Sequence, residues 1–324
     1  MKTIYLDNNA TTQVAPEVLE TMLPYFSELY GNPSSMHSFG GQVSKTIQHA
    51  RENVASLIGA DPEEIIFTSC GTESDNTAIM SALSVAPDKS HIITSRVEHP
   101  AVKVLCEHLT QRGYRVTELP VDRDGRLDME LFENSLSRDT AVVSLMWANN
   151  ETGVIFPVER AAQLAHERGI LFHTDAVQAV GKIPINMRAN NIDMLSFSGH
   201  KLHAPKGIGV LYIRKGTRFL PFMLGGHQEK GRRGGTENTA SIAGLGKACQ
   251  LAARNVETEN TRVKYLRDKL EDELLKSIPN SKVNGDRTNR LPNTTNISFE
   301  FIEGEGILLL MDQFNICASS GSAC

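Results

Sequence analysis

Short apolar runs alternate with helical stretches over most of the 324-residue chain. The helical stretches are roughly 10 to 15 residues long, and each apolar run ends in a polar loop that contains glycine. This alternation predicts βα units around a buried, mainly parallel sheet with helices on both faces. The apolar runs are Glu64–Thr68, His91–Ser95, Thr140–Met146, Gly169–Phe172, Asp193–Phe197 and Gly209–Ile213.

The pattern of polar and apolar residues changes after about Ala253. Glu257–Ile278 is charged and amphipathic, with leucines on one helical face. Alternation at Thr294–Phe301 predicts a strand, Gly304–Phe314 a helix, and Ile316–Cys324 a strand that runs into a Gly/Ser loop. The sequence therefore predicts an α/β protein with a large domain over residues 16–252 and a smaller α+β domain formed by residues 1–15 and 253–324.

Composition narrows the classes of function. The net charge is −5 and no basic run occurs, so we expect no nucleic-acid partner. The five cysteines form no C-x-x-C pair, which argues against a disulfide framework and a metal site. The N-terminus lacks the pattern of a signal peptide, and no apolar run approaches the ~20 residues that span a bilayer. We expect a soluble, cytoplasmic protein without a membrane partner.

Lys201 is the first candidate catalytic residue, because it follows an apolar run in Ser-Gly-His-Lys. Lysine forms Schiff bases with pyridoxal phosphate (PLP), although a lone loop lysine is ordinarily just solvated. PLP also needs a carboxylate opposite its ring nitrogen, and Asp175 ends the preceding apolar run. Gln178 can reach the phenolic oxygen of the ring. Taken alone, Asp175 could equally cap a helix.

A phosphate site is predicted at Gly71 and Thr72, which follow a strand and open a helix. Backbone amides and the helix dipole favour an anion there, although the same pattern is common as a plain helix cap. His99 follows another strand and could stack on the ring or move protons, while a structural role is the ordinary alternative. Asn150 lies either in a simple turn or beside the ligand.

Cys324 is the candidate nucleophile. It lies in Ser-Ser-Gly-Ser-Ala-Cys, where small residues favour the access that a reactive thiolate needs. Cys106 and Cys249 lie in helical patterns among apolar neighbours and are expected to be inert. Cys70 is expected to pack near the phosphate site, and Cys317 is expected to be buried.

Ten stretches together resemble a known family. They are YLDNNATT (5–12), GNPSSMHSFG (31–40), TSCGTES (68–74), VEHPAV (97–102), MWANNETG (146–153), HTDAVQAVGK (173–182), SFSGHKLHAPKGIGVLY (196–212), GGTEN (234–238), RLPNTTNISFE (290–300) and ASSGSAC (318–324). The chain resembles the NifS/IscS-type cysteine desulfurases, which are fold-type I PLP enzymes of the class V aminotransferase group. The residues of these motifs are most similar to those of the nitrogen-fixation, NifS, type.

The resemblance implies a role for each candidate. Lys201 holds PLP as a Schiff base, Asp175 pairs with the ring nitrogen, Gln178 with the phenolic oxygen, and His99 stacks on the ring and assists proton transfer. The phosphate ligands are Gly71, Thr72, Ser198 and His200. Thr236 reaches the phosphate of the partner subunit in a homodimer. Asn150 binds substrate and cofactor.

The resemblance also implies the reaction. L-Cysteine becomes L-alanine, and its sulfur is carried as a persulfide on Cys324 to an iron–sulfur scaffold protein of the NifU/IscU kind, with a nitrogenase-related role. Members of the family continue for several tens of residues past this cysteine and place a substrate-binding arginine there. We therefore expect the sequence to be part of a longer protein.

Three alternatives stay open. A selenocysteine lyase or another class V PLP enzyme would share Lys201 and Asp175 but would not need Cys324. An inactive, truncated chain that only dimerises or binds a scaffold would turn nothing over. A plain nucleotide-binding protein is disfavoured, because neither a P-loop nor a G-x-G-x-x-G pattern occurs.

Overall fold

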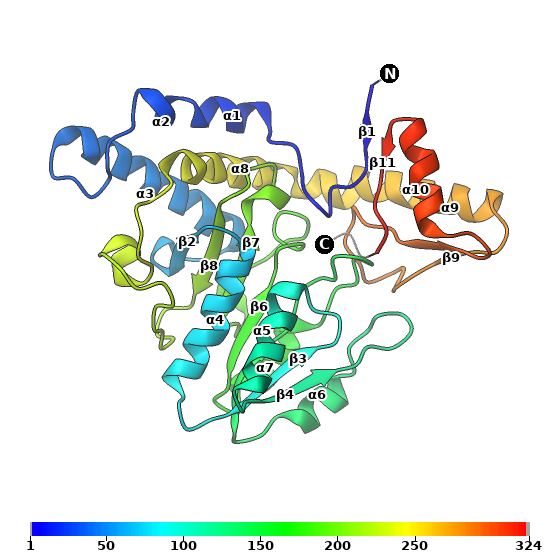
Figure 1. The fold of residues 1–324 in the computed structure, drawn as a ribbon, viewed down its shortest axis with the longest axis horizontal. Coiled ribbons are helices and arrows are strands. Elements are labelled where there is room, and N and C mark those ends of the chain that lie inside the picture. The colour runs from blue at the N-terminus through cyan, green and yellow to red at the C-terminus, as the bar shows by residue number, and fades with distance from the viewer. Residues whose placement is uncertain (1, 322–324) are drawn as a thin grey trace.

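A seven-stranded sheet forms the centre of the molecule (Figure 1). The structure is a computed structural model and describes residues 2–321. The strand order is β2-β8-β7-β6-β5-β3-β4, and β8 is antiparallel to both of its neighbours. The strands are β2 (Ile65–Thr68), β3 (His91–Ser95), β4 (Arg115–Leu119), β5 (Thr140–Ser144), β6 (Leu171–Asp175), β7 (Met194–Ser198) and β8 (Gly209–Ile213). The predicted mainly parallel sheet is confirmed.

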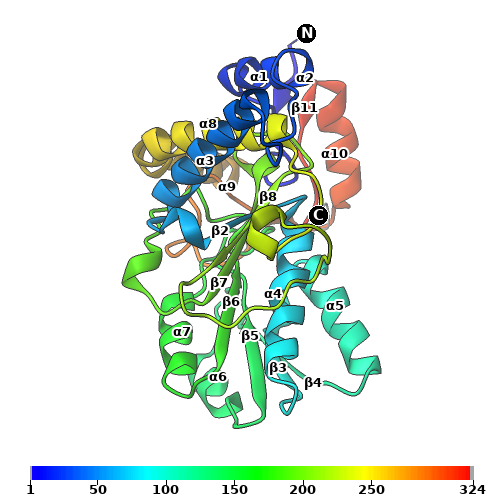
Figure 2. The same ribbon diagram turned by 90° about the vertical axis from the view of Figure 1, so that its left-hand side faces the viewer.

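Helices cover both faces of this sheet, as predicted (Figure 2). On one face lie α4 (Gly71–Val85) and α5 (Pro100–Gln111), whose apolar side chains share one cluster with the strands. The other face carries a larger cluster built by five helices. These are α1 (Pro16–Met22), α3 (Ser38–Ile58), α6 (Met129–Ser135), α7 (Val158–His166) and α8 (Thr239–Thr258). The short helix α2 (Pro24–Ser27) follows α1.

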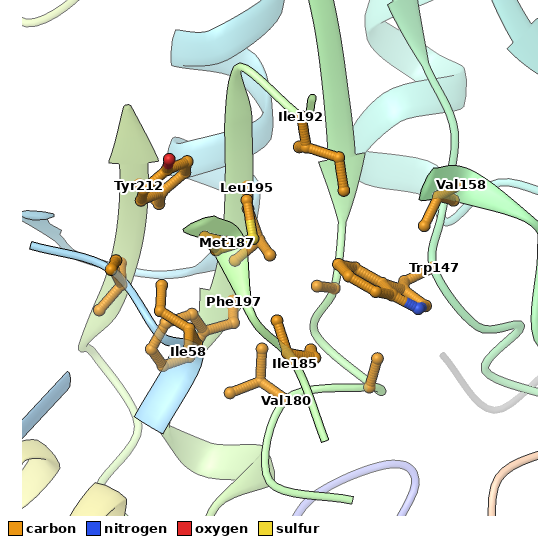
Figure 3. Close-up of a cluster of buried hydrophobic side chains, with 14 of the residues drawn as sticks. Ile58, Trp147, Val158, Val180, Ile185, Met187, Ile192, Leu195, Phe197 and Tyr212 are labelled. Carbon is orange, nitrogen blue, oxygen red and sulfur yellow. The ribbon is translucent and has the colours of Figure 1, made fainter. Parts of the chain in front are cut away.

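The strands alternate between the two clusters because successive side chains of a strand point to opposite faces. In β7, Met194 belongs to the α4–α5 side, whereas Leu195 and Phe197 belong to the other. Figure 3 shows these two residues near Tyr212 of β8 and Ile58 of α3. All are almost fully buried. The sheet edge that carries the candidate site therefore rests on a well-packed base.

The C-terminal part is built differently. Helix α8 continues through a π-helical segment (Glu259–Val263) into α9 (Lys264–Ser277). A hairpin-like pair follows, in which β9 (Ser281–Val283) is antiparallel to β10 (Ile297–Phe299). After α10 (Gly304–Gln313), β11 (Ile316–Cys317) pairs in parallel with β1 (Ile4–Tyr5).

Strand β1, near the start of the chain, and strand β11, more than 300 residues later, thus lie side by side (Figure 1). This pairing agrees with grouping residues 1–15 with 253–324, although the division into two domains stays a prediction. The expected apolar face of α9 is not buried in this chain, because Leu266 and Leu270 are about half exposed. Within residues 2–321, each helix is too short or too polar to cross a bilayer.

Candidate functional site

A cavity of about 290 Å³ opens at the carboxyl ends of β2, β3, β6 and β7. This volume lies near the lower end of the roughly 300–1,000 Å³ typical of small-molecule pockets. Nine predicted site residues line it: Gly71, Thr72, His99, Asn150, Asp175, Gln178, Ser198, His200 and Lys201. Ligands of open α/β sheets bind at such an edge. Residues far apart in the sequence therefore meet in one place.

Two predicted residues do not belong to this set. Thr236 is exposed, lies on the segment before α8, and does not line the cavity. That position leaves its predicted contact with a partner subunit untested. Cys324 lies outside the described residues.

Lys201 ends a single 3₁₀ turn that directly follows β7. Its side chain is buried, with 7% of the residue exposed, and Nζ donates a hydrogen bond of 2.8 Å to the carbonyl of Ala10. It also donates to the carbonyl of Asn9. A buried lysine amine that faces carbonyl oxygens and a cavity is a group suited to bond a carbonyl ligand.

Asp175 is the last residue of β6 and pairs in register with Ser196 of the neighbouring β7. Its carboxylate accepts a hydrogen bond of 2.9 Å from the backbone amide of Val177. Burial raises the pKa of Asp175, while Val177, His99 and Lys201 act in the opposite direction. The nearby cationic or hydrogen-bonding groups therefore favour a charged carboxylate, and a cationic ring nitrogen would add to them.

His99 is the N-cap residue of α5, and its Nδ1 accepts a hydrogen bond of 3.1 Å from the amide of Ala101. Burial lowers the pKa of His99, so the ring is neutral at neutral pH. Because Nδ1 accepts, the ring proton lies on Nε2. A neutral imidazole beside a cavity can stack on a ring and exchange a proton at Nε2.

The start of α4, which lines the same cavity, suits an anion. The amides of Gly71 and Thr72, the first two residues of α4, have no acceptor within the described chain. A Cβ at Gly71 would come within 2.9 Å of Val177 Cγ2, so only glycine allows this approach. Burial lowers the pKa of His200 to about 4, so this histidine is neutral and can donate a hydrogen bond. Free amides at a helix N-terminus favour phosphate.

Sequence reasoning missed several residues at this site. Asn9 and Ala10 hold Lys201, and the carbonyl of Asn9 also accepts from Gln178 Nε2 at 2.9 Å. Asp75 lines the cavity from the first turns of α4. A signal for Asp75 was available, because it follows Gly71 by four residues and so lies on the same helical face.

The cysteines can also be compared with expectation. Cys106 and Cys249 are buried, as predicted, and burial raises the pKa of Cys106 to about 12. Cys70 lines the cavity as the N-cap residue of α4, which agrees with packing near the phosphate site. The expectation for Cys317 was wrong: it is only partly buried, because β11 is a two-residue edge strand.

The residues around the cavity fit PLP in three ways. An amine, a carboxylate and a set of anion donors face one space, and these are the groups that PLP requires of a protein. The fit rests on the free amides at the start of α4 and on the close approach at Gly71. No cluster that could hold a metal ion occurs among the residues that the structure describes.

Comparison with known proteins agrees with this chemistry. The class-V aminotransferase family model matches residues 4–324. The chain is 60% identical over 325 residues to the cysteine desulfurase NifS of Azotobacter vinelandii and 59% identical over 324 residues to a cysteine desulfurase of Trichormus azollae. Each match covers all of this chain and 81% of the relative.

A solved structure described as a NifS-like protein superimposes with a TM-score of 0.95 at 39% identity. The match covers 98% of this chain and 87% of that one. The fold, the sequence and the residues of the cavity lead to the same assignment. The chain belongs to the class V aminotransferases and, within them, to the PLP-dependent cysteine desulfurases.

Proposed function

We propose that this chain converts L-cysteine to L-alanine and transfers the sulfur, as a persulfide on Cys324, to an acceptor protein for iron–sulfur cluster assembly. The observation that carries the proposal is the cavity that joins Lys201, Asp175 and the free amides of α4. The curated relatives named above support the substrate class. The NifS relative supports a nitrogenase-related role.

The residues of the cavity would bind different parts of the cofactor. Lys201 would hold the cofactor, Asp175 its ring nitrogen and Gln178 its phenolic oxygen. Gly71, Thr72, Ser198 and His200 would hold the phosphate, and Asn150 would contact substrate and cofactor. When bound, PLP supplies an electron sink that stabilises negative charge on the substrate carbon.

We assign proton transfer to Lys201, assisted by His99. The amine of Lys201 would take a proton from the substrate carbon and return one to it. His99 lines the same cavity and can assist this transfer by donating a hydrogen bond from its Nε2–H. Because burial keeps His99 neutral, this donor stays in place across the neutral pH range.

Sulfur transfer is the step assigned to Cys324. Its thiolate attacks the substrate sulfur, a sulfur–sulfur bond forms, and the carbon–sulfur bond of the substrate breaks. The electron pair of that bond goes to the substrate carbon, which takes up a proton and leaves as L-alanine. The persulfide then passes to a thiol of the acceptor, so no external oxidant is needed. A free thiolate requires a reducing setting such as the cytoplasm.

We propose a homodimer in which Thr236 reaches the phosphate of the partner's cofactor. Its exposed position, outside its own chain's cavity, supports this proposal. Leu220, Phe222 and Leu224, on the segment leading toward it, are 48%, 48% and 83% exposed. An apolar segment of this kind is typical of a subunit interface. The acceptor is expected to be a scaffold protein of the NifU/IscU kind.

The test is alanine formed from L-cysteine by the purified chain with PLP and a thiol reductant. Lys201→Ala is expected to abolish alanine formation, whereas Lys206→Ala, an exposed lysine on the same loop, is expected to retain it. Cys324→Ala should stop sulfur transfer but keep the absorption of bound cofactor, with Cys317→Ala as the matched cysteine control.

Two results would contradict the proposal. Full turnover of L-cysteine by Cys324→Ala would favour a selenocysteine lyase or another class V enzyme. A chain that binds PLP but forms no alanine above the Lys201→Ala background would be an inactive, cofactor-binding fragment.

A further inference from the structure

A second carboxyl group lies buried at the cofactor cavity, and the reaction described above gives it no role. Asp75 is 1% exposed, lies in the second turn of α4 and lines the cavity beside Asp175. Within residues 2–321 its Oδ1 has no hydrogen-bond partner, and Nε2 of His173 lies 3.5 Å from it. An unpaired polar atom at this depth is costly unless it has a use.

The histidine beside Asp75 brings no charge to it. His173 is fully buried, with Nδ1 2.9 Å from the hydroxyl of Ser144 and Nε2 2.8 Å from the hydroxyl of Ser196. Both ring nitrogens are therefore occupied by neutral hydroxyl groups. Burial lowers the pKa of His173 to about 3, so the ring is neutral at neutral pH. Asp75 thus has a neutral polar neighbour and no counter-ion there.

The titratable groups that act most strongly on the charge of Asp75 are acids. They are Asp175 on β6, Glu98 after β3 and Cys70 at the start of α4, and each disfavours a negative charge on Asp75. A hydrogen bond with Ser196 acts in the opposite direction. Burial is the largest cause, and together these groups hold the pKa of Asp75 well above its ordinary range.

Asp175 differs from Asp75 in its partners. It accepts the amide of Val177 and faces both His99 and the amine of Lys201. Two buried carboxyl groups that interact this strongly carry one negative charge between them at neutral pH. The charge goes to the member beside the donating amide of Val177 and the amine of Lys201, and the proton goes to the other.

We propose that Asp75 is a positioning residue that stays protonated and acts through Asp175, keeping the single negative charge of the pair on the carboxylate that faces the cofactor. The proposal deepens the proposed function, since it rests on the role of Asp175 given there. Asp75 makes no bond to the reacting atoms. Its neutral side chain prevents a second charge that would compete for the ring-nitrogen proton.

The experiment compares Asp75→Asn with Glu98→Gln in the full chain, with and without PLP. Asparagine keeps the size of a protonated aspartate and is permanently neutral. Glu98 is the matched control, because it is buried beside the same site and burial raises its pKa to about 8. Infrared spectroscopy at neutral pH reports each protonated carboxyl as a band that is distinct from carboxylate bands. PLP affinity is measured by fluorescence titration of the cofactor-free protein.

Each variant is expected to remove one protonated-carboxyl band from the spectrum. At neutral pH the Glu98→Gln protein should still show the band of Asp75, because its surroundings hold the pKa of Asp75 well above its ordinary range. Asp75→Asn should bind PLP within about threefold of the parent chain and keep its absorption spectrum, because one neutral side chain replaces another. A tenfold loss of affinity would instead correspond to an interaction of one pKa unit.

Three results would overturn the proposal. An unchanged carboxyl band in Asp75→Asn would mean that Asp75 is ionised in the parent chain. Loss of PLP affinity by about tenfold or more would mean that the charge of Asp75 is what matters. If Asp75→Asn does not fold, absence of a protonated-carboxyl band from the Glu98→Gln protein at neutral pH refutes it instead. These readouts need no turnover, so they stay separate from a failure of the desulfurase proposal.

Discussion

Removing Glu229 should destabilise the segment that leads to Thr236. The carboxylate of Glu229 accepts two hydrogen bonds of 2.8 Å from the guanidinium of Arg51 and one of 3.2 Å from the amide of Phe67. The side chains of Glu229 and Arg51 are only 3% and 13% exposed. This bidentate ion pair anchors the turn at Gln228–Gly231 against β2.

The magnitude follows from burial. Glu229→Ala leaves the guanidinium of Arg51 largely buried and without its counter-ion, a change that costs about 3–5 kcal/mol in proteins. Each kcal/mol lowers the melting temperature of a chain this large by about 2 °C, so a decrease of about 6–10 °C is expected. The control is Glu63→Ala, which removes the exposed partner of Lys230 and should leave stability unchanged.

Urea denaturation at one fixed PLP concentration measures the effect, because bound cofactor also adds stability. The double variant Arg51→Ala with Glu229→Ala should be more stable than the sum of the two single losses predicts, by about 0.5–3 kcal/mol. Strict additivity, or a loss in Glu229→Ala no larger than in Glu63→Ala, would refute the reasoning that the buried pair is strongly coupled.

Two further predictions concern the core. Gly246→Ala should cost about 1–3 kcal/mol, because its Cβ would lie 2.6 Å from Ala50 where α8 crosses α3, whereas Gly41→Ala meets open space and should cost nothing in thermal unfolding. Burial lowers the pKa of His173 from 6.5 to about 3, so below pH 6.5 the unfolded chain binds a proton that the folded chain does not. The free energy of unfolding should therefore fall between pH 6.5 and 3, and less steeply in His173→Gln, as urea denaturation at several pH values would show.

Most of the sheet could be predicted from apolar runs, and the missing strand shows the limit. Only two of the five residues in Arg115–Leu119 are apolar, and β4 is an edge strand with only one strand neighbour. Such a strand does not need the continuous apolar run of a central one. The antiparallel direction of β8 could not be predicted from the apolar runs either, because a run of apolar residues does not indicate the direction of its strand in the sheet.

The candidate site was predictable where a residue ends a strand or lies in the loop that follows it. Asp175 and Ser198 end β6 and β7, His99 lies in the loop after β3, and parallel strands end at one edge. Asn9 and Ala10 could not be found in this way. They lie on an irregular N-terminal segment whose carbonyls reach Lys201 only through long-range folding. Backbone groups carry no sequence signal, so such contacts appear only in the structure.

The antiparallel strand β8 also explains how Gly71 comes to lie beside Ser198. Because β8 runs opposite to its neighbours, it begins at the site edge, and its first residue, Gly209, lies in register between Thr68 of β2 and Ser198 of β7. A Cβ at Gly209 would come within 2.6 Å of the backbone of Cys70. The missing side chain lets the turn before α4 cross over β8, which brings Gly71 next to Ser198. A glycine in a strand that binds nothing itself thus joins the anion-binding amides to the strand that precedes Lys201.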